Sequence, residues 1–215
     1  MALNLDMSKA YDRMEWSFLK LLMLRMGFHE KWVGLMMMCI TTVSYSLLIN
    51  GEPTEKIIPS RGIKQGDPIS PYLFLLWSEG LHALIEKAAR ASLIRDISLC
   101  RNGPRITHLF FADDNLLYCR ASFQECIHIQ TILSKYEAAS GQKLKKDKTT
   151  LFFSKATSLS TQENIINLLR VSEVMQYEKY MGLPSFVGRG KKASFAFIKE
   201  RVWSKLKGWK EKLLS

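Results

Sequence analysis

The stretch Phe111-Ala112-Asp113-Asp114 places two adjacent carboxylates between two apolar runs, residues 106–111 and 116–118. Both runs are predicted to be short strands, and Ala-Asp-Asp-Asn supplies the turn chemistry between them. A hairpin with acids at its tip carries negative charge to the edge of a sheet, where a divalent cation can neutralise it. On this stretch alone, both acids can equally be turn residues, because turns favour Asp for local backbone reasons.

A third acid near the start of the chain extends this hypothesis. Residues 3–7, Leu-Asn-Leu-Asp-Met, are typical of a short buried strand that ends at Asp6. Mg²⁺ prefers hard oxygen ligands and usually takes one or two carboxylates. Two such ions, roughly 4 Å apart, can hold the attacking and leaving oxygens of a phosphoryl displacement. The residues alone leave open whether Asp6 and Asp113 meet in space.

Five segments resemble, in order, the palm motifs of reverse transcriptases. They are LDMSKAYD (5–12), RGIKQGDPISP (61–71), FADD (111–114), GQKLKKDK (141–148) and YMGLP (180–184). The closest resemblance is to LINE-type (non-LTR) retrotransposons, especially plant ones, and it continues through the basic tail. It implies an α+β reverse-transcriptase palm, with an antiparallel sheet backed by helices and followed by a basic helical segment. The implied activity is that of an RNA-directed DNA polymerase.

The resemblance also implies a domain organisation. Residues 1–184 are expected to form the palm, and residues 185–215 a basic linker and helix at the start of the thumb or connection. Because the chain starts five residues before Asp6, the upstream fingers and the endonuclease region of LINE proteins are expected to be missing. A palm without fingers is expected to bind nucleotide poorly. In the fourth motif, Lys145 stands where plant relatives usually have Asn.

By resemblance, Asp6 and Asp113 are ligands of two Mg²⁺ (or Mn²⁺) ions, and Asp114 is a second ligand or a structural acid of the turn. Lys148 matches the lysine of the fourth motif, a candidate to assist proton transfer to the pyrophosphate leaving group. Tyr11 matches the aromatic residue that lines the nucleotide sugar pocket and rejects a 2′-OH. Core packing is the alternative for this ring.

Further residues are implied in binding the dNTP, the RNA template and the DNA primer. Gln65 and Gly66 lie in a loop that leads into a helix, where backbone N–H groups can approach a ligand closely. The other candidates for contacts with nucleic acid are Arg61, Lys64, Tyr180, Met181, Gly182, Lys191, Lys192 and Trp203. A solvated charge is the alternative for Arg61 and Lys64, and core packing is the alternative for Trp203.

The formal net charge of +11 is unevenly distributed along the chain. Residues 1–140 carry 15 Lys/Arg and 14 Asp/Glu, whereas residues 141–215 carry 16 and 6. A basic region of this kind is the expected electrostatic footprint of a phosphate-backbone partner. A solvated basic surface, or contact with anionic lipid, is the alternative.

Composition also bears on location and on metals. No apolar run approaches the ~18 residues needed to span a bilayer, and the N-terminus has no secretory cleavage pattern. An intracellular protein, nuclear or cytoplasmic, with reduced thiols is therefore expected. Zinc binding by Cys119, Cys126 and His128 is disfavoured because no second pair of ligands completes a site.

Apolar spacing and turn signals predict the order of elements. Helices are expected over 16–26, 30–42, 71–91, 123–139, 161–169 and in the basic tail; strands are expected over 2–7, 43–49, 54–58, 106–118 (as a hairpin) and 149–153.

Two hypotheses for function follow. In the first, the chain is a polymerase fragment in which a primer 3′-OH attacks the α-phosphate of a dNTP and pyrophosphate leaves. In the second, it is a catalytically inactive, nucleic-acid-binding remnant of such an element. A hydrolase that uses the same acids is a distant third, since no nucleophile–base pair accompanies them.

Overall fold

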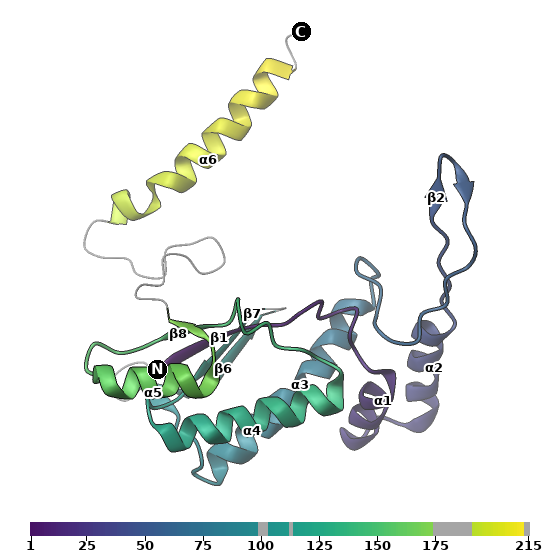
Figure 1. The fold of residues 1–215 in the computed structure, drawn as a ribbon. Coiled ribbons are helices and arrows are strands. Elements are labelled where there is room, and N and C mark those ends of the chain that lie inside the picture. Colours follow the sequence, from purple (N-terminus) through teal and green to yellow (C-terminus); the bar gives the residue numbers. More distant parts are fainter. Residues whose placement is uncertain (99–102, 112–113, 174–190, 213–215) are drawn as a thin grey trace. The chain divides into compact units, whose positions relative to one another are not determined.

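The computed structural model describes residues 1–98, 103–111, 114–173 and 191–212. The chain divides into two compact units, residues 1–173 and residues 174–215 (Figure 1). The first unit contains a five-stranded sheet with helices packed on it, and the described part of the second unit is one helix. The fold is mixed α+β, as the sequence predicts.

The central sheet has the strand order β6-β7-β1-β8-β9. All neighbouring pairs are antiparallel except β8 and β9, which are parallel. Two further pairs, β2-β3 and β4-β5, form separate two-stranded sheets. The strands are β1 (Ala2–Asp6), β2 (Leu48–Ile49), β3 (Glu52–Pro53), β4 (Ile97–Ser98), β5 (Arg105–Ile106), β6 (His108–Phe111), β7 (Asp114–Tyr118), β8 (Thr150–Phe152) and β9 (Ser172–Glu173).

Helices cover one face of the central sheet. Figure 1 shows α3 and α4 beneath the strands, with α5 beside β8 and with α1 and α2 next to the start of α3. The helices are α1 (Trp16–Arg25), α2 (Glu30–Thr41), α3 (Ser70–Arg90), α4 (Phe123–Ser140), α5 (Leu159–Leu169) and α6 (Lys191–Lys212).

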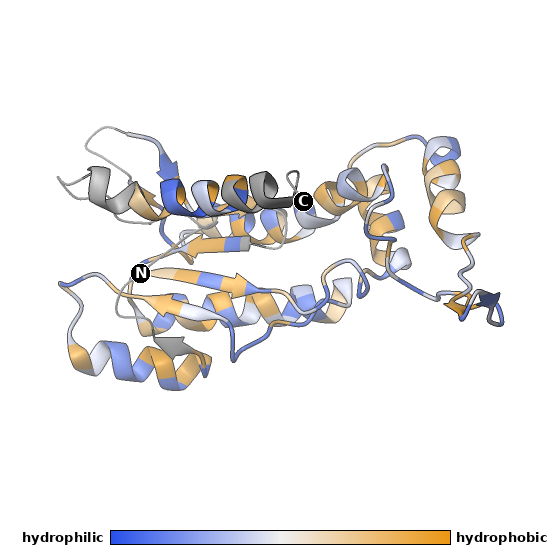
Figure 2. Cartoon of the chain, turned by 90° about the horizontal axis from the view of Figure 1, so that it is seen from above, coloured by the Kyte–Doolittle hydropathy of each residue, from blue (hydrophilic) through white to orange (hydrophobic). Residues whose placement is uncertain are grey.

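The core lies between the sheet and these helices. Burial alternates along β1, where Leu3 and Leu5 are fully buried and their neighbours are partly exposed, as expected for a strand with one covered face. Figure 2 shows β1 mainly in the colour of hydrophobic residues. On the helix side, Trp77 of α3 and Tyr136 of α4 are buried, with their ring centroids 5.4 Å apart. The apolar face of the sheet therefore fixes where α3 and α4 lie.

The predicted hairpin over 43–58 is shorter than the sequence indicates. Asn50 and Gly51, at φ values of 53° and 90°, form the predicted turn. Only two residues on each side pair as β2 and β3, followed by a single bridge between Tyr45 and Ile57. Leu48 is 74% exposed. The apolar residues here have no covered face to pack against, and this explains why a long strand pair does not form.

Most other boundaries agree with prediction within one or two residues. The α5 helix begins at Leu159, two residues before the predicted start, because Ser158 is the N-cap and its hydroxyl accepts the Thr161 N–H (3.3 Å). The two-residue strands β4 and β9 were not predicted. In the α6 helix, considered by itself, the large apolar side chains of Val202, Trp203 and Leu206 are exposed. No helix in the described part of the chain is long and apolar enough to cross a membrane.

Two histidines join α3 to β6. Nδ1 of His82 and Nε2 of His108 lie 2.8 Å apart, and the other ring nitrogen of His108 lies 2.8 Å from the Thr107 hydroxyl. A hydrogen bond between two imidazoles needs one nitrogen without a proton. Burial, and secondly the charge of His82, lower the pKa of His108 below its ordinary value of 6.5, although Glu86 opposes this.

This pair predicts a loss of stability in acid. Because the pKa of His108 is lower in the folded chain, the unfolded chain binds a proton more readily below pH 6.5. The free energy of unfolding should therefore fall as the pH decreases through and below that value, and His108→Gln should lose less. Urea unfolding at about pH 7.5 and about pH 5.5 measures this difference. An equal loss of unfolding free energy in the wild type and in His108→Gln would contradict the assignment of this effect to His108.

Candidate active site

The sheet order brings the first and third motifs together. The strand β7 lies beside β1, and the register places Asp114 directly opposite Asp6. On its other side, Asp114 pairs with Phe111 of β6. Asp113 lies outside the described residues. The separation along the chain carries no information on this pairing, and the structure shows that Asp6 and Asp114 are neighbours across two strands.

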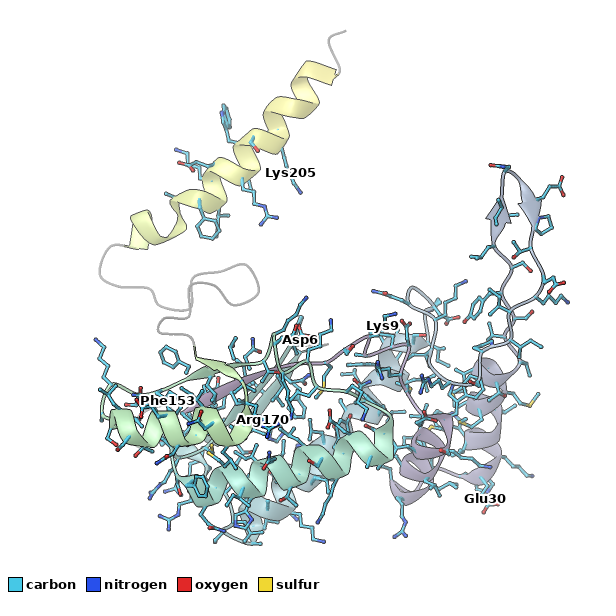
Figure 3. The ribbon with its side chains drawn as sticks, viewed as in Figure 1. Asp6, Lys9, Glu30, Phe153, Arg170 and Lys205 are labelled. Atoms are coloured by element: carbon cyan, nitrogen blue, oxygen red, sulfur yellow. The ribbon has the colours of Figure 1, made fainter. Side chains whose placement is uncertain are left out.

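The fourth motif is held against the same end of β1. The Ser8 N–H donates to the Lys143 carbonyl (2.8 Å), and the Lys145 N–H donates to the Asp6 carbonyl (2.9 Å). The Asp6 N–H donates to the hydroxyl of buried Thr149 (3.4 Å). Asp6, labelled in Figure 3, is therefore held by the β7 ladder on one side and by Lys145 and Thr149, which precede β8, on the other.

Lys145, to which the motif resemblance assigns no role, pairs with Asp6. Nζ of Lys145 lies 3.7 Å from Oδ1 of Asp6, and the two side chains are 35% and 39% exposed. At this exposure the pair adds about 0–1 kcal/mol to stability, but it places a cation beside the candidate metal ligand. Lys148, the predicted catalytic lysine, is exposed, and its backbone N–H donates to the Lys145 carbonyl (3.1 Å). The two lysines therefore share one turn.

Tyr11 lies in the loop that follows Asp6. Its ring stacks on Phe74 of α3 with 4.8 Å between centroids and 9° between planes. Its carbonyl accepts the Ile63 N–H of the second motif (3.0 Å). The side chain is partly buried and packs against the core. Core packing, the alternative for this ring, is therefore present, and the sugar-pocket role remains a prediction.

Gly62 joins the first and second motifs. Its N–H donates to the Met14 carbonyl (2.8 Å), and its carbonyl accepts from the Trp16 indole (2.7 Å). Its φ is +82°, and an added Cβ would lie 2.7 Å from the Asp12 carbonyl oxygen. Glycine alone fits both the backbone conformation and this close approach. The sequence signal for this residue was the second motif itself.

The rest of the second motif leads into α3. Gln65 and Gly66 are exposed, and Gly66 has a φ of +90°. Asp67 then orders the turn before α3, whose N-cap is Ile69: the Asp67 carboxylate accepts the Ile69 N–H (3.0 Å) and its carbonyl accepts the Ser70 N–H (3.1 Å). The loop therefore keeps its two predicted nucleotide-binding residues open to solvent.

A cavity of about 290 Å³ lies against this loop. Its wall includes the predicted residues Arg61, Lys64 and Gln65, together with Asp12 and Tyr45. Arg61 pairs with Glu15 (3.4 Å), and Nζ of Lys64 lies 6.0 Å from the centre of the Tyr45 ring. Both cations are exposed, so the solvated-charge alternative stands beside these contacts.

The remaining predicted residues belong to the second unit. Tyr180, Met181 and Gly182 lie outside the described residues. Lys191 and Lys192 begin α6, and Trp203 on the same helix is 67% exposed. Because α6 is described by itself, core packing stays an untested alternative for Trp203. The boundary predicted at residue 184 also lies outside the described residues.

The whole first unit matches a protein-family model. The match covers residues 1–185 and is to the reverse transcriptase (RNA-dependent DNA polymerase) family. The chain therefore belongs to the reverse transcriptase family.

Similar proteins include an uncharacterized mitochondrial protein of Arabidopsis thaliana, 49% identical over 31% of this chain and 55% of that protein. The Pol polyproteins of retrotransposable elements R2 from Popillia japonica and R2DM from Drosophila melanogaster are 32% and 30% identical. These alignments cover 53% and 67% of this chain, but only 18% and 13% of the polyproteins. The chain thus matches about half of the first relative and a small part of the other two.

Two solved telomerase structures share the fold. Telomerase from Candida tropicalis superposes with a TM-score of 0.56, covering 73% of this chain and 31% of that one. Telomerase from Candida albicans, in complex with a fragment of telomeric RNA, superposes with a TM-score of 0.54, covering 73% of this chain and 27% of that one. Both are 16% identical to this chain. At this identity the likeness concerns the fold alone, and it agrees with the predicted palm.

The close approach at Gly62 predicts a large loss of stability in Gly62→Ala. The positive φ alone costs about 1–2 kcal/mol for a residue with a Cβ, and the approach to the Asp12 carbonyl adds to it. Gly27→Ala is the matched control, since Gly27 has a φ of +91° and no atom within 4 Å of its added Cβ. Urea unfolding should show the larger loss in Gly62→Ala, and equal losses would contradict the close approach.

Proposed function

We propose that this chain is the palm-containing part of an RNA-directed DNA polymerase from a LINE-type retrotransposon. The observation that carries the proposal is the register pair Asp6–Asp114 at the sheet end where the first, third and fourth motifs meet. Membership of the reverse transcriptase family, and similarity to R2 Pol polyproteins, support it. The similarity to a plant mitochondrial protein agrees with a plant element.

The donor set at this end of the sheet suits Mg²⁺ or Mn²⁺. Asp6 is a partly exposed carboxylate, and residues opposite each other on antiparallel strands have Cβ atoms about 4.5–5.5 Å apart. Hard oxygen ligands at such spacing fit a divalent cation, with Asp113 as a further ligand. The described residues alone hold no cluster of three or more His, Cys, Asp or Glu. Bound ions would polarise the α-phosphate and neutralise charge as pyrophosphate leaves.

The chain's own residues then position the reactants. Gln65 and Gly66 are proposed to contact the dNTP, and their exposure and the cavity that Gln65 lines support this. Lys148 is proposed to give a proton to the pyrophosphate. Tyr11, held on Phe74, is proposed to exclude a ribose 2′-OH. Base pairing with the template selects the nucleotide, so the protein reads shape more than sequence.

One observation favours the inactive alternative. The Lys145 ammonium lies 3.7 Å from the Asp6 carboxylate that a metal ion would need. If this pair excludes the ion, the chain is a nucleic-acid-binding remnant of the element and the acids are structural.

Primer extension tests the proposed activity. With an RNA template, a DNA primer, dNTPs and Mg²⁺ or Mn²⁺, Asp6→Asn and Asp113→Asn should each reduce extension on the order of 100-fold, because each removes a ligand of the cations that neutralise charge in the transition state. Glu163→Gln, an exposed acid on α5, is the charge-matched control and should retain activity. Folded protein that does not extend the primer would contradict polymerase activity in this chain and leave a palm fragment whose remaining role is binding.

Metal binding tests the role of Lys145 without reference to activity. Removing a positive charge about 4 Å from a ligand should tighten Mn²⁺ binding about fivefold in Lys145→Asn, as measured by calorimetry. Lys155→Asn removes the same charge from an exposed site beyond the other end of β8 and should bind as the wild type does.

The variant Asp6→Asn separates the metal site itself from the effect of Lys145 on that site. Asp6→Asn should lose most of the affinity for Mn²⁺. If it does, and Lys145→Asn equals the wild type, the effect proposed for Lys145 is wrong while the metal site stands. If Asp6→Asn binds Mn²⁺ as the wild type does, the metal site itself is wrong.

A further inference from the structure

A second basic cavity lies away from the motifs. Its volume is about 620 Å³, and it is formed by the end of α3, the turn that follows, the β4-β5 pair and Arg120, two residues after β7. Its charged lining consists of Arg95, Arg105, Arg120 and Asp96. Among the residues that the structure describes, the charged lining is thus three cations and one anion, and none of them belongs to the five motifs.

A buried carboxylate fixes the backbone at two of these arginines. Glu125 of α4 is 8% exposed, and its Oε2 accepts the backbone N–H of Arg95 (3.1 Å) and of Arg120 (3.1 Å). These two hydrogen bonds satisfy the buried charge, as a buried carboxylate requires. The segment after α3 and the segment after β7, which are distant in sequence, are therefore held together by one side chain of the neighbouring helix.

The guanidinium groups differ in what they contact. Arg105 pairs with Asp96 (3.4 Å) at an exposed position. Arg95 and Arg120 are exposed and form no ion pair within the described part of the chain. Because Arg presents a planar fork of N–H donors that matches phosphate oxygens, convergent arginines without partners suit a phosphate group.

The cavity lies at the opposite end of β7 from the acids. Arg120 is six residues beyond Asp114, and a strand rises about 3.3 Å per residue, so the two sites are separated by about 20 Å. This distance corresponds to about six nucleotides of a strand at 3.4 Å each. Anything bound in this cavity is therefore held away from the reacting end of a primer.

We infer that this cavity is a second nucleic-acid contact, in which Arg95, Arg105 and Arg120 bind backbone phosphates of an RNA strand remote from the acids. The phosphate chemistry follows from the arginines, and the choice of RNA as its source rests on the proposed function. The contact adds affinity without sequence preference, since phosphates carry no base information.

The expected signature is a change in salt dependence. For single-stranded nucleic acid, log K falls with log salt with a negative slope. Removing one phosphate-binding side chain makes this slope shallower by about 0.7. The double variant Arg95→Gln/Arg120→Gln should therefore make the slope shallower by about 1.4 and weaken RNA binding about tenfold at about 100 mM KCl. The substitutions leave the backbone N–H groups that Glu125 binds in place.

Fluorescence anisotropy with a labelled RNA of about 20 nucleotides tests this, using the full chain. Lys20→Gln/Arg25→Gln is the matched control, because it removes two exposed charges from α1, which does not line the cavity. A urea unfolding curve close to that of the wild type shows that the cavity variant is folded.

The outcomes are separable. A shallower salt dependence of RNA binding in the cavity variant, with the control close to wild type, supports the second contact. Equal slopes and affinities in the cavity variant and the control overturn it, whatever primer extension shows. A cavity variant that loses only the binding of inorganic phosphate, measured by calorimetry, with unchanged RNA binding, also overturns it, since the phosphate would then not come from nucleic acid.

Discussion

The antiparallel pairing of β1 with β7 is the constraint on which the rest of the structure depends. This one ladder joins the first and third motifs, which are more than a hundred residues apart in the chain, and its register fixes which residues face each other. A slip of one residue would exchange the two faces of the strand. Leu3 and Leu5 would then leave the core, and Asp6 would enter it. Burial of these two leucines therefore also determines where the carboxylate lies.

Much of the fold follows from local patterns in the sequence. Helices with regular apolar spacing, such as α3 and α4, agree with prediction within a residue or two, because one face of each has to be buried. The hairpin near Leu48 was predicted too long, since β-branched and apolar residues favour a strand only where neighbours cover them. The two-residue strands β4 and β9 have no periodicity to detect, and they form through tertiary context.

The candidate site could be predicted only in part. The motif resemblance singles out Asp6, and the structure places Asp114 opposite it, but no local pattern indicates that Lys145 contacts that carboxylate. Likewise, nothing in the spacing of Arg95 and Arg120 shows that they share a cavity, because their meeting depends on Glu125 of a third segment. Contacts of this kind are set by packing between distant segments, and a single sequence carries no signal for them.

The most direct test of the account is a crystal structure of the chain soaked in Mn²⁺, with anomalous diffraction used to locate the ions. We predict an anomalous peak about 2.0–2.2 Å from a carboxylate oxygen of Asp6, at the end of the sheet where Asp6 pairs with Asp114. The Lys145 ammonium would be displaced from its position 3.7 Å from Asp6. The absence of any peak at Asp6, with Lys145 still paired to it, would contradict the account.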